Sequence, residues 1–310
     1  MSRIYEALQK AESERKLDRT ENEPRVPAER LDTRSAVAAA EYETPSSFAA
    51  PHTTEFSGEA TSGGLNLEAI PRYAWNPSIS RLPSLLDRGP AIEQFRSLRS
   101  RVYELRDIRP IKSILVSSGL PQEGKSFISA NLAMSLARHK NSKVLLIDGD
   151  MRRYTLHELL GTESHPGLAD YLAGKASMEE IMQRPQDAGN SNSGLQALAN
   201  LTFIPGGNGG DKAADLSGNA RFGELLRTAA SYFDWIIVDS SPVLPVSDGV
   251  NLARSCDGVL LVARSGVTKY TVAQRAAAEM RAANILGFVL NAVEESPQVG
   301  SYYGYNANKE

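Results

Sequence analysis

The amino-acid sequence predicts an α/β fold, with a doubly wound, mainly parallel sheet between two layers of helices. Two observations predict it. From residue 111 onwards, short apolar segments that suit strands alternate with amphipathic segments that suit helices, which is the order typical of such sheets. Some of these segments, such as Val144–Ile147, are continuously apolar, as strands covered by helices on both faces require.

The predicted elements follow one another along the second part of the chain. A helix is expected at 91–106, where apolar residues recur every three or four positions. The expected strands are 112–118, 143–148, 201–204, 234–239, 258–264 and 286–291. Helices are expected between them, including 125–139, 220–232 and 268–282, and the segment 189–194 is expected to be a surface loop.

The chain before this domain predicts two further segments. Apolar residues fall on one face of a short helix at 2–16, which is either a frayed terminal helix or a docking helix for a partner. The segment that follows is polar and rich in Pro, Ser and Gly, so it predicts a disordered linker. We therefore expect an amphipathic helix at 1–16, a linker at 17–87, a folded domain at 88–295 and a flexible tail at 296–310.

Composition limits the class of protein. The net charge of -3 argues against a broad nucleic-acid-binding surface. The single cysteine, Cys256, excludes an intrachain disulfide and suits a reducing cytoplasm. No segment approaches the ~18 consecutive apolar residues of a membrane span. We therefore expect a cytoplasmic protein without a span of its own, which a partner would recruit to the inner face of the membrane.

A glycine-rich segment lies between the first predicted strand of the domain and the helix that follows. It reads Gly119, Leu120, Pro121, Gln122, Glu123, Gly124, Lys125 and Ser126, and Phe127 continues into the helix. This is the spacing of a P-loop in its strand–loop–helix context. Backbone N–H groups of such a loop and the positive end of the helix bind phosphates. The sequence predicts a P-loop NTPase with a nucleotide site, and an ordinary glycine-rich turn is the alternative.

Three aspartates follow or end strongly apolar strands. Asp148 and Asp150 come at the end of one strand, and Asp239 ends another. Ligands of open α/β sheets bind beyond the carboxyl ends of the strands, so the fold would bring these carboxylates to Lys125 and Ser126. One such aspartate could simply cap a helix. Three of them beside a P-loop favour a site for Mg²⁺ and phosphate.

These residue types suit phosphoryl transfer from ATP. We expect Lys125 and Mg²⁺ to neutralise the departing phosphate oxygens. Ser126 and Asp239 would hold the cation, which needs few protein ligands. Either Asp148 or Asp150 is then free to take a proton from an incoming hydroxyl group. Arg152 would orient Asp150 or stabilise charge in the transition state, or it is an ordinary surface residue.

The C-terminal segment contains Tyr302, Tyr303 and Tyr305 among Gly, Ser and Asn residues. The segment has no apolar periodicity, so these tyrosines are not expected to build a core. They are either a flexible strip of phosphate acceptors that can enter an active site or part of a disordered tail.

From about residue 88 to its end, the chain resembles the bacterial tyrosine kinases, the P-loop autokinases of capsule and exopolysaccharide synthesis. The resemblance rests on four blocks in a fixed order. They are Glu93, Arg96 and Arg99 in a Glu-x-x-Arg-x-x-Arg pattern, the P-loop followed by Asn131-Leu132-Ala133, Asp148-x-Asp150-x-Arg152, and the Asp239 strand with the later Asp257–Val262. The opening segment at 2–8 is similar to the starts of kinases of exosortase-type loci.

The resemblance implies roles for the site residues. Residues 119–127 would contact the nucleotide, with Lys125 and Ser126 binding ATP and Mg²⁺. Asp148 would be the base, Asp150 would be a metal-binding or orienting residue, and Asp239 would complete the metal site. The tyrosine cluster would be the site of autophosphorylation.

The resemblance also implies an assembly. Subunits would form a ring through Glu93, Arg96 and Arg99, and each tail would enter the active site of a neighbour. Phosphates on the tail would add negative charge and could dissolve the ring. The absence of a predicted span suggests the split form, in which a separate membrane protein of the chain-length-determinant type activates the kinase.

Two other functions stay open at this point. A partitioning or positioning ATPase would share the fold but usually has a lysine where this chain has Leu120. A regulatory scaffold would bind nucleotide without catalysis. The chain also departs from the kinase pattern at Asn208–Lys212 and at Ser240-Ser241-Pro242, and its tail holds only three tyrosines, so loop contacts and the order of acceptors stay open.

Overall fold

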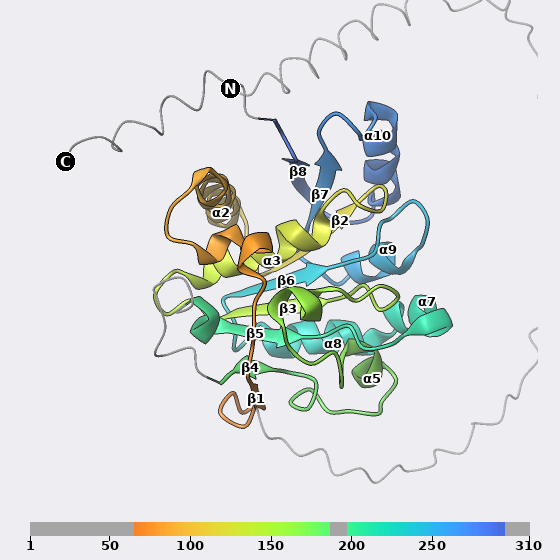
Figure 1. The fold of residues 1–310 in the computed structure, drawn as a ribbon. Helices are drawn as coiled ribbons and strands as arrows, with labels where there is room; N and C mark the ends of the chain where they lie inside the picture. Colours follow the sequence, from red (N-terminus) through yellow and green to blue (C-terminus); the bar gives the residue numbers. More distant parts are fainter. Residues whose placement is uncertain (1–64, 187–196, 295–310) are drawn as a thin grey trace, which may run out of the picture. The chain divides into compact units, whose positions relative to one another are not determined.

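A six-stranded parallel sheet forms the centre of the computed structural model, which describes residues 65–186 and 197–294 (Figure 1). The strands are β2 (Ser113–Ser118), β3 (Val144–Asp148), β5 (Leu201–Ile204), β6 (Trp235–Asp239), β7 (Gly258–Arg264) and β8 (Ile285–Asn291). They lie in the order β5-β3-β6-β2-β7-β8, and all neighbouring pairs are parallel. Each predicted strand is confirmed, with its start within one residue of the expected position.

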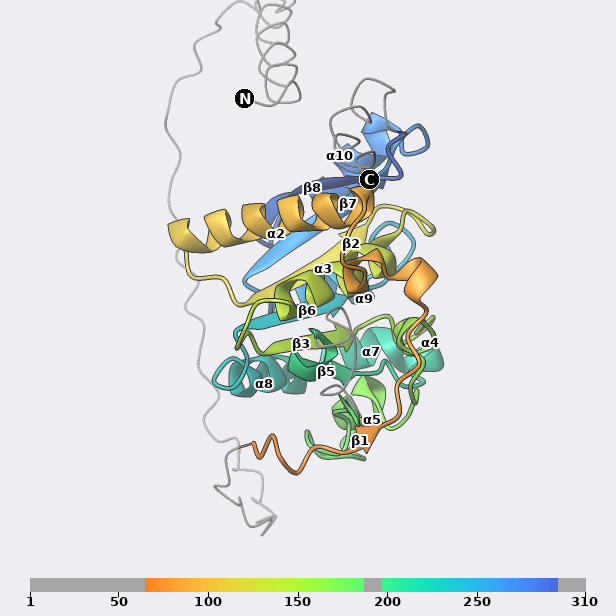
Figure 2. The same cartoon turned by 60° about the vertical axis from the view of Figure 1, so that its left-hand side comes forward.

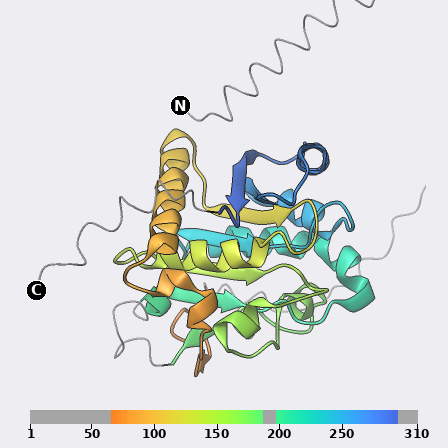
Figure 3. The ribbon, with the colours of Figure 1, turned by 45° about the horizontal axis from the view of Figure 1, so that its top comes forward.

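Helices cover both faces of this sheet. They are α2 (Pro90–Ile108), α3 (Lys125–Ala137), α4 (Leu156–Leu160), α5 (Leu168–Leu172), α7 (Ala213–Ser217), α8 (Ala220–Ala229), α9 (Asp248–Ala253) and α10 (Tyr270–Glu279). Short 3₁₀ turns are η1 (Ile79–Arg81), η2 (Pro83–Leu85), η3 (Ala197–Asn200) and η4 (Gly210–Lys212). The helices predicted near 91–106, 125–139, 220–232 and 268–282 are α2, α3, α8 and α10. In Figure 3, α10 is seen end-on, while α2 and α3 cross over one face of the sheet.

The alternation of side chains along the strands produces two separate cores. In β2, Ile114 and Val116 pack with α2 and α3, whereas Leu115 joins the core beneath α8, α9 and α10. The other inner strands divide in the same way, and their side chains are buried on both faces. Figure 2 shows α2 and α3 on one side of the strands and α8 on the other. The doubly wound fold that the sequence predicts is confirmed.

The strand order determines which residues meet at the carboxyl edge of the sheet. β2, which leads into the P-loop, lies between β6 and β7. β3 lies on the far side of β6, and Asp148 pairs in register with Asp239. Because the strands are parallel, the P-loop and the ends of β3 and β6 must lie at the same edge.

The predicted linker at 17–87 is wrong for residues 65–87, which pack against the domain. Leu82 is fully buried and Leu85 is 5% exposed, both in the core beneath α3. A strand, β1 (Arg72–Tyr73), pairs with β4 (Arg184–Pro185). These apolar residues are too widely spaced to show periodicity, and backbone pairing leaves no signal in side-chain composition. For these reasons, sequence patterns do not indicate that this segment is ordered.

Other predicted segments lie outside the described residues. These are the helix at 2–16, the loop at 189–194 and the tail with its three tyrosines. The predicted bounds of the N-terminal helix and of the C-terminal tail therefore stay a prediction. None of the helices in the described part of the chain has the length and apolarity that a membrane span needs.

We predict that the packed segment contributes to stability through its buried leucines. Leu82→Ala should lower the free energy of unfolding by about 2–5 kcal/mol, because it removes a fully buried side chain and leaves a cavity. Leu86→Ala is the matched control in the same turn, where the side chain is 43% exposed, and should change it by no more than about 0.5 kcal/mol. Urea denaturation measures both. Equal effects of the two substitutions would show that the segment does not pack as described.

Candidate active site

The P-loop lies between the end of β2 and the start of α3. Gly124 closes it in a left-handed conformation, with φ of 97°. A Cβ at this position would lie 2.0 Å from the side-chain nitrogen of Asn291, so only glycine fits. Within the described residues, no acceptor takes the backbone N–H groups of residues 124–127. These donors, at the N-terminus of a 13-residue helix, are available to phosphate.

The buried side chain of Glu123 holds the P-loop in shape. Its carboxylate accepts hydrogen bonds from the Leu120 N–H, at 2.8 Å, and from the Thr268 hydroxyl group. Asn291, at the end of β8, donates its side-chain amide to the Glu123 carbonyl oxygen at 3.0 Å. Glu123 is only 3% exposed. The sequence predicted it as a nucleotide contact, whereas its side chain binds the loop and the turn before α10.

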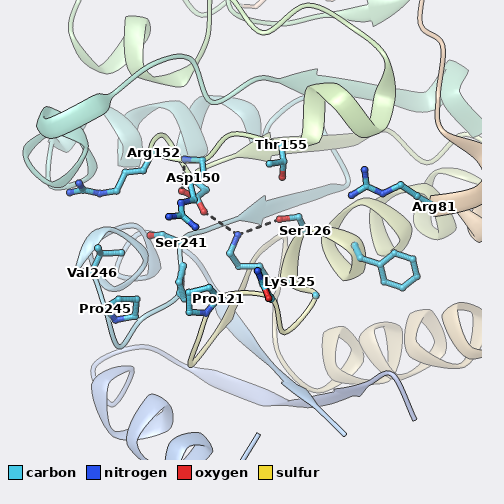
Figure 4. Close-up of a pocket in the computed structure, with 15 residues that line it drawn as sticks. Arg81, Pro121, Lys125, Ser126, Asp150, Arg152, Thr155, Ser241, Pro245 and Val246 are labelled. Carbon is cyan, nitrogen blue, oxygen red and sulfur yellow. Dashed lines mark hydrogen bonds and ion pairs between the residues drawn. The ribbon is translucent and has the colours of Figure 1, made fainter. Parts of the chain in front are cut away.

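The P-loop lysine lies among carboxylates. The Lys125 Nζ is 3.1 Å from the Asp150 Oδ2, a contact drawn in Figure 4. The same nitrogen is 3.8 Å from the Asp239 Oδ2. The Ser126 hydroxyl oxygen is 3.3 Å from the same nitrogen. Asp148 lies beside Asp239 in the sheet register. The structure thus brings all five of these residues to one place, as the strand order requires.

Burial raises the pKa of the aspartates in this cluster. The pKa of Asp148 is well above its usual range, because burial disfavours its charge and the neighbouring Asp239 carboxylate repels it. Burial also raises the pKa of Asp239, although the Lys125 charge opposes the shift. Burial alone would lower the pKa of Lys125, but the charges of Asp239 and Asp150 outweigh it, so that the pKa is raised. The lysine therefore stays charged in the folded protein.

Asp148 has a structural role that the sequence did not reveal. It is fully buried, and its two carboxylate oxygens accept the N–H groups of Asp150 and Leu156, each at 3.1 Å. It thereby holds the turn that carries Asp150 and the start of α4. Asp150, in contrast, lines the adjoining cavity together with Lys125 and Ser126.

This cavity has a volume of ≈ 530 Å³ and adjoins the P-loop. Pro121, Gln122, Gly124 and Phe127 also line it, whereas Gly119, Leu120 and Glu123 of the predicted nucleotide-binding set do not. Another part of the lining comes from the loop after β6, including Ser241 and Pro245, which lie next to Pro121 (Figure 4). The volume lies within the range of about 300–1,000 Å³ that small-molecule sites occupy.

Arg152 has a different partner from the one expected. Its guanidinium donates to the carboxylate of Asp248, with Nε at 2.6 Å from Oδ2 and Nη2 at 3.4 Å from Oδ1. Asp248, at the start of α9, is 1% exposed. Arg152 lines the cavity, and both hydrogen bonds that its side chain makes go to the carboxylate of α9 and not to Asp150. Its role in catalysis stays a prediction.

The residues of the cluster fit a hydrated divalent cation. The Asp239 Oδ2 is buried and has no hydrogen-bond partner, while its Oδ1 accepts from the Ser129 hydroxyl at 3.1 Å. Within the described residues, no three His, Cys, Asp or Glu side chains form a metal-binding group. Mg²⁺ takes one or two carboxylates and otherwise water and phosphate oxygens, so Asp239 with Ser126 suits it.

The Glu-x-x-Arg-x-x-Arg residues lie on α2, away from this cluster. Glu93 and Arg96 form an ion pair with each other, and both are partly exposed. The Arg99 guanidinium donates to the Ser135 carbonyl oxygen of α3 at 2.7 Å. The tail tyrosines lie outside the described residues, so the structure does not place them at the site.

Comparison with known proteins agrees with this geometry. Residues 114–303 match the family model described as the CobQ/CobB/MinD/ParA nucleotide binding domain. The tyrosine-protein kinase YwqD of Bacillus subtilis is 33% identical over 220 residues, which cover 70% of this chain and 87% of that protein. The chain belongs to the bacterial tyrosine-protein kinase family.

Two further relatives agree with this family assignment. The tyrosine-protein kinase wzc of Salmonella typhimurium is 33% identical over 219 residues, and the match spans 69% of this chain but only 28% of that longer protein. The kinase domain of the Escherichia coli tyrosine kinase ETK superposes with a TM-score of 0.62 at 28% identity, covering 73% of this chain and 84% of that domain. The predicted family and P-loop NTPase fold are confirmed.

We predict that the hydroxyl group of Thr268 stabilises the P-loop. Thr268→Val keeps the shape of the side chain but leaves the buried Glu123 carboxylate without this donor and the Arg264 N–H without its acceptor. The free energy of unfolding should fall by about 1–3 kcal/mol. Thr268→Ser, which restores a hydroxyl group, should recover most of that loss. If the valine and serine variants unfold at the same urea concentration, the contact does not support the loop.

We also predict a pH-dependent effect of Asp148→Asn in the nucleotide-free and metal-free protein. The pKa of Asp148 is raised on folding, so the folded protein retains a proton that the unfolded chain releases. The free energy of unfolding therefore falls as pH rises from the pKa of Asp148 in the unfolded chain to its higher pKa in the folded protein. Asparagine removes this loss. The free energy of unfolding of the variant, relative to wild type, should therefore increase as pH rises above about 4, by at most about 1.4 kcal/mol per pH unit. A difference that stays constant from pH 4 to pH 7 would contradict the shift.

Proposed function

We propose that this chain is an ATP-dependent protein-tyrosine kinase that phosphorylates tyrosines of its own C-terminal segment. One observation carries the proposal: the P-loop lysine, the Ser126 hydroxyl and the Asp150 carboxylate line one cavity at the N-terminus of α3. The names of the relatives, tyrosine-protein kinases over most of this chain's domain, support the reaction class. The acceptors would be Tyr302, Tyr303 and Tyr305.

ATP would bind with its phosphates at the P-loop. The free N–H groups of residues 124–127 and the Lys125 ammonium would contact phosphate oxygens, as in other P-loop sites. Mg²⁺, bound by Ser126 and Asp239 with Asp150 nearby, would supply charge neutralisation for the phosphate oxygens. Asp150 and Asp239 hold Lys125 in place before the nucleotide arrives, so little side-chain rearrangement is needed.

In the transfer, a tyrosine hydroxyl oxygen forms a bond to the γ-phosphorus while the bond from this phosphorus to the bridging oxygen of ADP breaks. The phenolic proton passes to a carboxylate. Asp148 suits this role because its raised pKa brings it closer to neutral pH, where a general base works best. Its carboxylate is fully buried, so the turn that carries Asp150 must open for the acceptor to reach it. Arg152, beside Asp248, would add positive charge to the cavity wall.

The biological setting that the family resemblance implies is also part of this proposal. The kinase would act in exopolysaccharide or capsule synthesis and export. Subunits would assemble into a ring through Glu93, Arg96 and Arg99 on α2, so that the tail of one subunit reaches the cavity of the next. A membrane protein of the chain-length-determinant type would recruit the cytoplasmic kinase to the membrane and activate it.

The proposal predicts phosphotyrosine that depends on both the site and the tail. Purified full-length protein, incubated with ATP and Mg²⁺ and with a fragment of the membrane partner where needed, should gain phosphate on the tail tyrosines, seen by mass spectrometry. Lys125→Met should reduce the incorporated phosphate by at least about 100-fold, because a charge that stabilises the transition state is lost.

Replacement of the three tail tyrosines with phenylalanine separates this kinase from a positioning ATPase. The triple variant should lose tail phosphate but still bind ADP like wild type, because the changes lie outside the cavity. ATP hydrolysis without any phosphotyrosine in wild type, unchanged by the triple substitution, would instead support the ATPase. Phosphotyrosine that persists in Lys125→Met would refute the assigned site.

A further inference from the structure

Arg81 is a cation of the nucleotide cavity that comes from outside the family domain. It lies at the end of η1, in the segment before residue 88, whereas the matched family domain covers 114–303. Figure 4 shows its guanidinium directed toward Ser126 and Thr155, on the side of Lys125 opposite to Arg152. Arg81 lines the same cavity as the P-loop residues.

The Arg81 guanidinium has no hydrogen-bond or ion-pair partner within residues 65–186 and 197–294. Arg152, the arginine on the other side of the cavity, is bound to Asp248. A cation that lines a cavity without a protein partner can pair with an anionic ligand at no cost of breaking an existing contact. Arg81 therefore brings an available guanidinium from the N-terminal segment to the cavity.

The backbone at Arg81 is held in place by α3, the helix that begins with the P-loop lysine. The buried Asn131 of α3 donates to the Arg81 carbonyl oxygen at 3.3 Å and accepts the Ser84 N–H at 3.0 Å. The guanidinium of Arg138, the residue that follows α3, donates to the Ser84 carbonyl oxygen at 2.9 Å. With Leu82 fully buried beside it, the position of Arg81 relative to the P-loop is defined before any ligand binds.

The charge of the cavity favours a polyanion. Its charged lining consists of four cationic side chains and one carboxylate, namely Arg81, Lys125, Arg152, Arg153 and Asp150. The carboxylate is already paired with Lys125. Phe127, on the first turn of α3, lines the cavity as well, so the wall with the free N–H groups continues toward Arg81. Guanidinium groups match phosphate oxygens with two parallel hydrogen bonds.

We propose that Arg81 binds a phosphate group of the nucleotide, so that the segment at 65–87 completes the nucleotide site of this kinase. The proposal rests on the nucleotide site of the proposed function and deepens it. It assigns a ligand contact to a segment that precedes the matched family domain.

The test uses the full chain and measures nucleotide binding without requiring kinase activity. Arg81→Gln should raise the Kd for a fluorescent ADP analogue with Mg²⁺ by about 3- to 10-fold, the effect of one lost charge-assisted contact at a partly solvated site. It should weaken competition by inorganic tripolyphosphate by the same factor. Arg81→Lys keeps the positive charge but cannot donate two parallel hydrogen bonds to a phosphate, so it should recover part of the lost affinity.

Arg88→Gln is the matched control, since Arg88 lies in the same segment and is exposed like Arg81, but does not line the cavity. It should leave both affinities unchanged. The proposal is overturned if Arg81→Gln binds ADP like wild type, if the two glutamine variants lose equal affinity, or if tripolyphosphate competition is unaffected.

A second readout separates a nucleotide contact from a contact with the acceptor. In a kinase assay, Arg81→Gln should raise the KM for ATP and leave the KM for a tyrosine peptide unchanged. The reverse pattern overturns the proposal and assigns Arg81 to the acceptor. If wild type binds ADP and only the effect of Arg81 is missing, the proposed function stands; if wild type does not bind ADP, both fail.

Discussion

The placement of one lysine between two buried carboxylates is the constraint on which the site depends. Lys125 is largely buried, and a buried charge is stable only when it is paired. Asp150 and Asp239 supply the pairs, but they come from the ends of different strands. The lysine can have both partners only if β2, β3 and β6 are neighbours and end at the same edge. The parallel order of the sheet is therefore a requirement of this ion cluster as well as a means of burying apolar side chains.

Two outlying parts of the chain support the P-loop from different directions. On one side, the end of β8 and the turn before α10 contact it through Asn291 and Thr268, which bind the backbone and side chain of Glu123. On the other, Asn131 joins α3 to the turn at Arg81. Neither contact belongs to the P-loop pattern. Both reduce the freedom of a loop that must present its N–H groups to phosphate, which makes binding less costly in entropy.

The sequence was sufficient to predict the strands and the convergence of the charged residues at one edge of the sheet. Both follow from local patterns combined with the geometry of parallel sheets. The sequence was not sufficient for the contacts that depend on distant packing. Arg152 lies in a pattern that suggested Asp150 as its partner, yet Asp248, almost 100 positions later, is the carboxylate that α9 brings to it. Glu123 was read as a nucleotide contact because it lies within the P-loop, but the direction of its side chain depends on Thr268. The segment at 65–87 was read as a linker, since a few isolated leucines that fill gaps beside α3 leave no periodic signal.

The folded part of the chain extends beyond its family domain. The matched domain contains the P-loop and the carboxylates, while the preceding segment adds core residues and a guanidinium at the cavity. The most direct test of the central claim is a crystal structure of the full chain with Mg²⁺ and a non-hydrolysable ATP analogue. We expect phosphate oxygens on the N–H groups of residues 124–127 and on the Lys125 ammonium, with the cation beside Ser126 and Asp239. A nucleotide bound elsewhere, with the P-loop empty, would contradict the account.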